Sequence, residues 1–243
     1  MAQNPVLREG NFEHLNVFDS KQVMTLQGTI NKTFLLLFIC VVTAMFSWTN
    51  PQIFGSGWMS FSLIGAFVVG IITALKPAWS PVTALVYAAL QGVLLGSVSA
   101  TYNARTNGIV FNAVAITMLV FFVMLVIYRF QIIRVTRGFM IGVMSAMFAI
   151  CLLYFGSWIL SFFFGVNPTY LTSNSPLSIG ISIVICIVAA LNFLPDFAFI
   201  DQMTHRYNAP KYMEWFAGFG LLVTLIWLYI EVLDLLSKLN SRR

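Results

Sequence analysis

The chain has 243 residues, of which 59% are hydrophobic and only 9% are charged. Since a soluble domain carries about 25% charged residues, this composition excludes an ordinary soluble domain and predicts an integral membrane protein. The net charge of +5 does not indicate nucleic-acid binding, because the basic residues are scattered between apolar runs and form no basic-aromatic surface pattern.

Residues 1–32 are polar and of mixed charge, and they predict an exposed N-terminal arm. The first apolar run begins only at Thr33. A cleavable signal opens instead with a basic region and a short apolar core. We therefore expect no cleaved signal and a first run that is retained as a membrane helix.

Seven apolar runs follow the arm, separated by turn signals such as Asn50-Pro51 and Lys76-Pro77. A bilayer core of about 30 Å needs about 20 apolar residues in a helix, and each run has roughly this length. The sequence therefore predicts an all-α membrane domain over residues 33–243. Its expected helices cover about 33–49, 57–75, 81–101, 108–128, 138–164, 177–202 and 213–239.

The charges of the connecting segments predict the orientation. A cytoplasmic N-terminus places nine basic residues inside, namely Arg8, Lys21, Lys32, Lys76, Arg129, Arg134, Arg137, Arg206 and Lys211. It leaves four outside, namely Arg105, Lys238, Arg242 and Arg243. The positive-inside rule then favours a cytoplasmic N-terminus and an outer C-terminus. The basic C-terminal cluster opposes this, so a re-entrant sixth or seventh segment stays open as an alternative.

Small residues recur at every fourth position in the third and fifth runs: Ala88, Gly92, Gly96 and Ala100, then Gly138, Gly142 and Ala146. Lipid tails give helices no hydrophobic reason to associate, so close backbone approach at small residues supplies the packing. This pattern predicts a compact bundle, and a pore lined by glycines is the alternative.

Four of the eight acidic residues lie in the apolar stretches 190–201 and 218–234, on either side of a short polar link: Asp196, Asp201, Glu231 and Asp234. A charge at the centre of a membrane helix costs about 2.5–3.5 kcal/mol on insertion scales, so such residues are functional candidates. We expect no Lys or Arg at mid-membrane depth to neutralise them. A buried carboxylate then either keeps a proton or binds a cation, and the two states together make a pH-sensitive cation site.

Asp196 follows Pro195, which cannot donate to the Leu191 carbonyl and is expected to kink the sixth helix. The freed carbonyl and the Asn192 side chain are then oxygen donors beside Asp196. On straight helices Asp196 and Glu231 lie roughly 10 Å apart along the membrane normal, so the kink must bring them together if they meet.

The other two acids have simpler interpretations. Asp201 lies near the end of its run, where facing water and taking part in function both stay open. Asp234 lies four residues before Lys238, so an ion pair at the membrane interface is the favoured interpretation.

No enzymatic motif is present. Cys40, Cys151 and Cys186 form no metal-ligand cluster, and there is no Gly-rich phosphate loop, His-Glu metal pair or Ser/His/Asp order. The acids would allow an aspartyl intramembrane protease only weakly. We expect no enzyme and no cofactor, with Ca²⁺ as a transported or bound ion at most.

Three segments near the C-terminus carry a resemblance: FLPDFAFID (193–201), APKYMEW (209–215) and GLLVTLIWLYIEVL (220–233). They resemble the C-terminal signature of the Bax inhibitor-1/YccA-like family, in its bacterial branch with an N-terminal arm. ALQGVLLG (89–96) and VFFVMLVIYR (120–129) fit the same pattern. The resemblance spans about residues 33–239.

The resemblance implies six helices around a central seventh, with a pH-sensing acidic pair on the last two and a pH-gated calcium leak. By position, Asp196 is the sixth-helix acid, with Asp201 as a rival, and Glu231 is the seventh-helix acid. The chain departs from the family in having Glu231 instead of Asp, Gln91 instead of Glu in the third helix, and Ala198 instead of an acid. Fewer acids weaken the case for tight cation binding.

The sequence thus predicts a cation leak, with Ca²⁺ favoured, gated by Asp196 and Glu231. These two carboxylates, with Asn192 and freed carbonyls, would form a weak Ca²⁺ site, and Gln91 and Asp234 would support it. The alternative is a regulatory protein that binds a membrane protease or another membrane assembly through its arm. The lipid bilayer is an expected partner and nucleic acid is not, and the expected location is a bacterial inner membrane.

Overall fold

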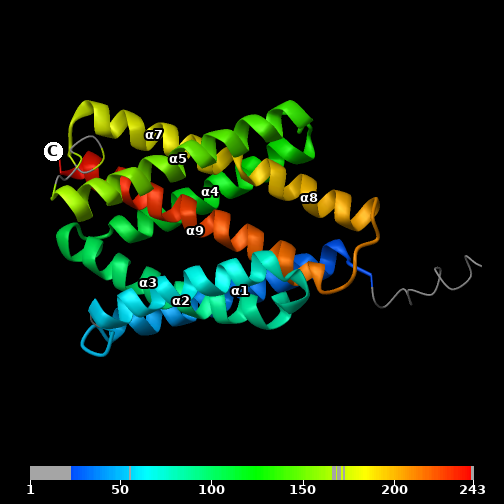
Figure 1. Ribbon diagram of the computed structural model, residues 1–243, viewed down its shortest axis with the longest axis horizontal. Helices are drawn as coiled ribbons and strands as arrows, with labels where there is room; N and C mark the ends of the chain where they lie inside the picture. The colour runs from blue at the N-terminus through cyan, green and yellow to red at the C-terminus, as the bar shows by residue number, and fades with distance from the viewer. Residues whose placement is uncertain (1–22, 55, 166–167, 169–170, 172, 242–243) are drawn as a thin grey trace, which may run out of the picture.

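A computed structural model of the chain describes residues 23–54, 56–165, 168, 171 and 173–241. Within these ranges the chain is helical, with seven stretches long and apolar enough to cross a membrane, which confirms the predicted all-α membrane fold. The elements in Figure 1 are α1 (Leu26–Thr49), α2 (Ser56–Leu75), the 3₁₀ turn η5 (Pro77–Trp79), α3 (Ser80–Arg105), α4 (Ile109–Arg129), α5 (Arg137–Phe164), α7 (Pro176–Leu191), α8 (Phe193–His205) and α9 (Met213–Asn240).

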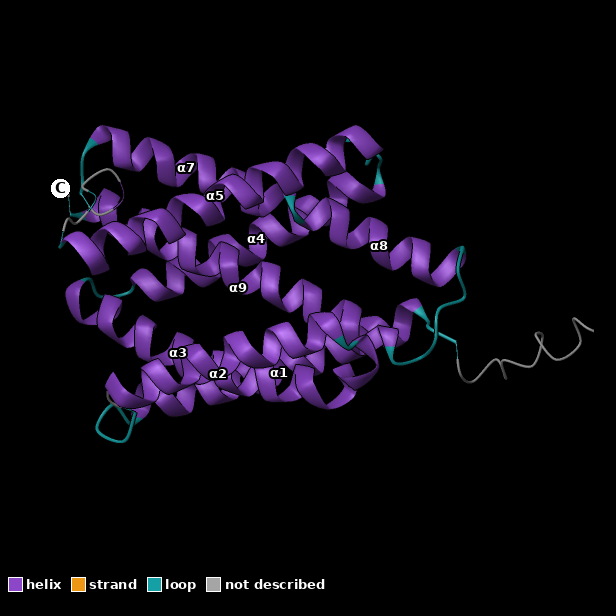
Figure 2. Ribbon diagram, in the orientation of Figure 1, coloured by secondary structure: helices purple, strands orange, loops and turns teal. Residues whose placement is uncertain are grey.

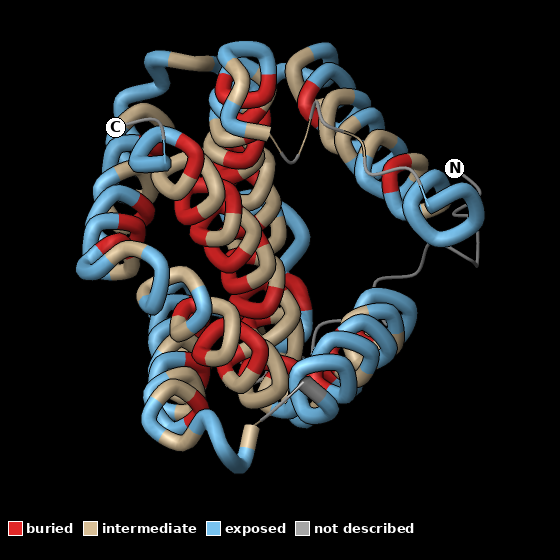
Figure 3. Tube along the Cα trace, turned by 90° about the vertical axis from the view of Figure 1, so that its left-hand side faces the viewer, coloured by how far each residue is buried: buried red, intermediate tan, exposed pale blue. Residues whose placement is uncertain are grey.

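Helix α9 runs through the middle of the bundle. It packs against α1 and α3 on one side and against α4, α7 and α8 on the other (Figures 1 and 2). Buried positions follow the helices at the centre, whereas the outer helices are largely exposed (Figure 3). The outer helix α2 packs mainly on α3, and α5 packs on α7. The last helix is therefore central, as expected, but only part of the other six pack along it.

The two ends of the bundle differ in charge. At one end of the bundle lie the first residues of α1 and α9 and the last residues of α4 and α8 (Figure 1). The last described residues of the chain lie at the opposite end. Helices α7 and α8 together form the sixth span and cross the bundle in one direction, and α9, the seventh span, crosses it in the other. Neither the sixth nor the seventh span is therefore re-entrant. We call the first end the basic end, because its connections carry Lys76, Arg129, Arg134, Arg137, Arg206 and Lys211.

Helix α1 starts at Leu26, seven residues before the expected Thr33. Thr25 caps it by accepting a hydrogen bond from the Gly28 N–H at 3.0 Å. Lys32 is therefore a helical residue and not part of an arm. Residues 1–22 of the predicted arm lie outside the described residues. An isolated β-bridge between Val23 and Pro210 ties the chain to the segment just before α9.

Small residues bring α1 and α3 together. A Cβ atom on Gly92 would lie 2.3 Å from the Cys40 carbonyl oxygen, and one on Gly96 would lie 2.2 Å from that of Ala44. Only glycine permits such an approach, which confirms the prediction for the third helix. The prediction for the fifth helix is wrong, because Cβ atoms on Gly138 and Gly142 would meet no described atom within 4 Å.

The sixth span is broken as expected. Helix α7 ends at Leu191 and α8 begins at Phe193, with Asn192 between them. Pro195 lies in the first turn of α8 and has no N–H to offer the Leu191 carbonyl. The Asp196 N–H reaches back to the Asn192 carbonyl at 3.4 Å. The break thus places Asp196 directly after an interruption of the helix.

Candidate functional site

A stripe of polar side chains runs along one side of α9. It consists of residues spaced alternately three and four apart, which places them on the same side of a helix. We call it the polar stripe, and its members are Thr224, Trp227, Glu231, Asp234 and Lys238. Each of them makes a polar contact with another stripe residue or with a neighbouring helix.

Asp196 meets the stripe at Thr224. The Thr224 hydroxyl donates to Asp196 Oδ2 at 2.6 Å, which joins the first turn of α8 to α9. The Asp196 side chain is half-buried. A hydroxyl donor satisfies one oxygen of a carboxylate that would otherwise lie unpaired among apolar groups.

Glu231 is held by two aromatic donors. The residue is 4% exposed. The Tyr154 hydroxyl on α5 lies 2.9 and 3.0 Å from its two carboxylate oxygens, and Trp227 Nε1 donates to Oε1 at 3.0 Å. These neutral donors satisfy the carboxylate without a cation. Hydrogen bonds are stronger when the acceptor is ionised, so these donors stabilise the ionised form of the buried carboxylate.

Asp234 pairs with Lys238, as the four-residue spacing predicts. Lys238 Nζ lies 2.6 Å from Asp234 Oδ2, and it also donates to Ser182 Oγ on α7 at 2.8 Å. Lys238 is 6% exposed. The structure therefore contains the expected pair of Asp234 and Lys238, and the lysine is buried next to the carboxylate.

Asp201 faces outward. Its Oδ1 lies 3.0 Å from His205 Nδ1, and both side chains are more than half exposed. This geometry matches the interpretation that Asp201 faces solvent. Asp201 makes no hydrogen bond to Asp196 or Glu231 in the described structure, although all three were candidates for one site.

Asp196 and Glu231 each have their own hydrogen-bond donors, and the structure does not join them as a hydrogen-bonded pair. Thr224, which holds Asp196, lies seven residues before Glu231, or about 10 Å along the helix axis at 1.5 Å per residue. Joint ligation of one cation would require both carboxylates to leave their present partners. The described residues contain no group of three or more His, Cys, Asp or Glu side chains that could hold a metal ion.

A cavity of about 210 Å³ lies between α5, the α7–α8 break and α9. At about 30 Å³ per water, it has room for about seven waters. Its walls include the groups that hold the two acids, Thr224 for Asp196 and Tyr154 with Trp227 for Glu231. The lining residues are Met147, Ile150, Cys151, Tyr154, Asn192, Val223, Thr224 and Trp227. We call this space the acid cavity.

The two amides proposed as supporting residues differ in position. Asn192 lines the acid cavity, and its side-chain nitrogen lies 3.7 Å from Met147 Sδ. Gln91 donates to the Tyr87 hydroxyl at 3.0 Å, and its Oε1 is buried with no partner among the described residues. Gln91 lies on α3 and does not line the acid cavity, so the structure gives it no contact with either acid.

A second buried carboxylate cluster lies at the basic end. Glu214 is 1% exposed, forms an ion pair with Lys32, and accepts from both the N–H and the hydroxyl of Thr25 at 2.9 Å. We call these three residues the latch, since they tie the start of α1 to the start of α9. Sequence reasoning gave Glu214 no role, because its partners lie more than 180 residues away.

The chain was also compared with known proteins. No curated protein matches it. A family model described as Bax inhibitor 1 like matches residues 4–241, which include all of the described helices. The match covers the broken α7–α8 span, the polar stripe and the latch. Together with the seven membrane-spanning helices, it identifies the family of the chain. The chain belongs to the Bax inhibitor 1 like family.

Proposed function

We propose that this membrane protein provides a proton-sensitive leak for cations, with Ca²⁺ as the favoured ion, through the acid cavity. The single observation that carries the proposal is a cavity in the membrane-spanning region whose walls include the side chains that bond the two acids. Thr224 bonds Asp196, and Tyr154 and Trp227 bond Glu231. An ionised carboxylate in a site of low dielectric attracts a cation, and protonation removes that attraction. Protons and cations would then compete for Asp196 and Glu231.

The arrangement described here fits a closed state. Tyr154 and Trp227 donate hydrogen bonds to the Glu231 carboxylate, and Thr224 donates one to the Asp196 carboxylate. A cation must displace these donors to bind. Calcium prefers six to eight oxygen ligands, and the two carboxylates could supply only some of them. Hydroxyl groups, the Asn192 side chain and water would supply the rest. Binding of this kind is weak, as passage through a leak requires.

Helix α5 is the element that we propose to move. It carries Tyr154, yet it buries only Val143 and Ser157 of its own residues. In contrast, α9 buries residues along most of its length. A displacement of α5 would therefore take Tyr154 away from Glu231 and widen the acid cavity while α9 stays in place.

Calcium flux into proteoliposomes tests the leak. Wild-type protein should pass Ca²⁺ at a rate that changes between roughly pH 5 and 8. Asp196→Asn and Glu231→Gln should alter the flux and flatten its pH dependence. Tyr154→Phe should raise the flux, since it removes a donor that competes with the cation. Asp201→Asn is the matched control, because this acid is exposed and lies away from the cavity, and it should leave the flux unchanged.

Two results would contradict the leak. One is the absence of Ca²⁺ flux at every pH in that range. The other is an equal effect of Asp201→Asn and Glu231→Gln, which would assign the pH response to surface charge. Reconstitution efficiency and protein orientation are measured for each variant so that flux is expressed per correctly inserted molecule.

The alternative, a regulatory protein that binds a membrane protease or another membrane assembly, has one supporting observation. The segment before α1 is anchored, because the Met24 N–H bonds the Ala209 carbonyl at 2.7 Å and Thr25 bonds Glu214. An arm would thus leave the bundle from a fixed point at the basic end. Deletion of residues 1–22 keeps these anchors. A partner-binding protein should lose its effect on the partner, whereas a leak should keep its flux.

We also propose that the basic end faces the cytoplasm of a bacterial inner membrane. Positive charge in the connections at this end supports the proposal through the positive-inside rule. A cysteine introduced at exposed Lys211, in protein whose three native cysteines are replaced, should resist membrane-impermeant thiol reagents in intact cells. Labelling at that position would reverse the proposed orientation.

A further inference from the structure

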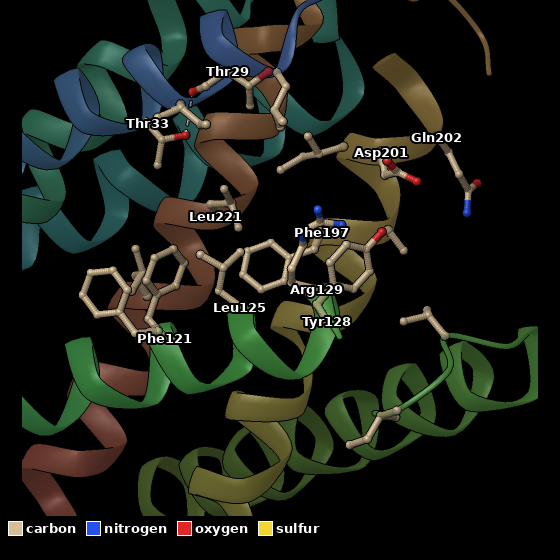
Figure 4. A pocket seen from close by; sticks show the side chains of 18 of the residues that line it. Thr29, Thr33, Phe121, Leu125, Tyr128, Arg129, Phe197, Asp201, Gln202 and Leu221 are labelled. Carbon is tan, nitrogen blue, oxygen red and sulfur yellow. Dashed lines mark hydrogen bonds between the residues drawn. The ribbon is translucent and has the colours of Figure 1, made fainter. Parts of the chain in front are cut away.

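A cavity of about 900 Å³ lies between α1 on one side and α4 and α8 on the other, with α9 as its floor (Figure 4). Ligand pockets usually measure about 300–1,000 Å³, so this space is large enough for a sizeable molecule. Its floor and walls are apolar, with Leu221 and Leu225 from α9, Phe121 and Leu125 from α4, and Phe197 from α8. We call it the lateral cavity.

The lateral cavity adjoins the membrane side of the bundle. Over their described residues α1 and α4 do not pack along each other, so the wall between them is incomplete. Phe34 on α1 and Phe122 on α4 line the cavity and are 68% and 58% exposed. In a bilayer such side chains lie against acyl chains, so lipid tails have access to the cavity from the side.

Two arginines stand at the basic end of the cavity. Arg129 is the last residue of α4, and Arg134 follows in the connection to α5. Both are exposed, and neither guanidinium has a hydrogen bond or an ion pair with the described residues. The rim also carries a carboxylate, Asp201, but this group is paired with His205 at 3.0 Å. With two guanidinium groups against one carboxylate, the rim carries a net positive charge.

The depth of Arg129 matches that of a lipid headgroup. Helix α4 has 21 residues, and at 1.5 Å per residue it spans about 31 Å. The hydrocarbon core is about 30 Å thick, so Arg129 reaches the interface where lipid phosphates lie. Apolar walls at the depth of the acyl chains thus continue into a basic rim at the depth of the phosphates.

We propose that the lateral cavity binds an anionic glycerophospholipid, with its phosphate on Arg129 and Arg134 and an acyl chain along α4 and α9. Arginine is suited to this role because its planar guanidinium can bond a phosphate through two N–H groups. Basic pockets between helices on the cytoplasmic side bind anionic headgroups in the same way. The charge of the rim selects an anionic lipid over a zwitterionic one, whose net charge is zero. The apolar walls select a lipid over free phosphate.

The test is native mass spectrometry of the full-length protein with phosphatidylglycerol and phosphatidylcholine present in equal amounts. The wild type should retain phosphatidylglycerol preferentially. Arg129→Gln and Arg134→Gln should each reduce this preference by about tenfold, the effect of one charge-assisted hydrogen bond. Arg137→Gln is the matched control: it removes the same charge from an exposed residue nearby that does not line the cavity, and it should keep the preference. The variant with Arg129→Lys and Arg134→Lys should keep most of the preference for phosphatidylglycerol. This result would show that the Gln variants lose the preference through lost positive charge and not through misfolding.

A lipid with a photoreactive acyl chain locates the site. Crosslinks should form with the segments of α1 and α4 around Phe34 and Leu125 and should decrease when Ile30→Trp fills the cavity. The proposal is overturned if the wild type shows no preference for phosphatidylglycerol, if Arg137→Gln reduces it as much as Arg134→Gln, or if crosslinks lie elsewhere. A preference that emerges only after deletion of residues 1–22 would also overturn it, because the arm and not a lipid would then occupy the cavity.

Discussion

Removal of the Glu214 carboxylate should strongly destabilise the protein. Glu214→Ala leaves Lys32 without its partner and the Thr25 N–H without its acceptor, both at a helix junction shielded from solvent. The side chains of Glu214 and Lys32 are 1% and 17% exposed, so water can compensate only the lysine, and only in part. The start of α1 should then separate from the start of α9.

The expected magnitude follows from this burial. Breaking a buried ion pair by removing one partner costs about 3–5 kcal/mol. An exposed pair contributes only about 0.2–1 kcal/mol. Because Lys32 keeps some contact with water, we expect a loss for Glu214→Ala near the lower end of the buried range, about 3 kcal/mol. Glu214→Gln should cost less, since its amide oxygen can still accept from Thr25.

The assay is reversible unfolding of the purified protein in mixed micelles, with Lys32→Met and the double variant completing a mutant cycle. We expect a coupling energy above about 1 kcal/mol, the upper value for exposed pairs. Hydrogen exchange supplies a local measure: the amides of Met24 and Thr25 should lose protection in Glu214→Ala. Asp201→Ala, which breaks an exposed pair, is the control and should change the free energy of unfolding by less than about 0.5 kcal/mol. If Glu214→Ala costs no more than Asp201→Ala, the latch does not hold the two helices together.

Replacement of glycine by alanine should lower the free energy of unfolding at some sites and raise it at others. A Cβ on Gly28 would lie 2.2 Å from the Glu214 carboxylate, which the latch holds in place, so Gly28→Ala should destabilise the wild type but not Glu214→Ala protein. Gly96→Ala should cost about 1–3 kcal/mol, because its Cβ would collide with the Ala44 carbonyl. Gly142→Ala meets no such obstacle and should stabilise α5 by up to about 1 kcal/mol. The same unfolding titration measures all three, and equal effects would refute the packing described for α1 and α3.

Hydropathy alone predicts the seven spans, because membrane helices of about 20 apolar residues have a signal that no loop in this chain imitates. The start of α1 is missed for a physical reason. Lys32 lies in the second turn of α1, where its charge is compensated by Glu214. A charged residue at the edge of an apolar run in the sequence can thus lie inside the helix, and only its contact with a partner distant in the chain reveals this.

The candidate site was predictable only where contacts are local. The pair of Asp234 and Lys238 follows from a spacing of four residues, and the break at Pro195 follows from the missing N–H. Tyr154 could not be found, since its contact with Glu231 joins residues 77 positions apart. Trp227 could have been found. It precedes Glu231 by four residues on one helix, where an indole N–H readily reaches a carboxylate.

The latch and the polar stripe are mechanically linked, because one helix carries both. Helix α9 runs without a proline from Met213 to Asn240, so a change at its start is transmitted along the axis. Slippage by one residue would shift Glu231 by about 1.5 Å and turn it by about 100°. Hydrogen bonds of 2.9–3.0 Å to Tyr154 would not survive this shift. Loss of the latch should therefore change the leak and also lower the protection of the Met24 and Thr25 amides from hydrogen exchange. Tyr154→Phe should change the leak but leave the protection of these two amides unchanged, because the latch stays intact. The two measurements together separate a helix that is out of register from a gate that has lost its donor.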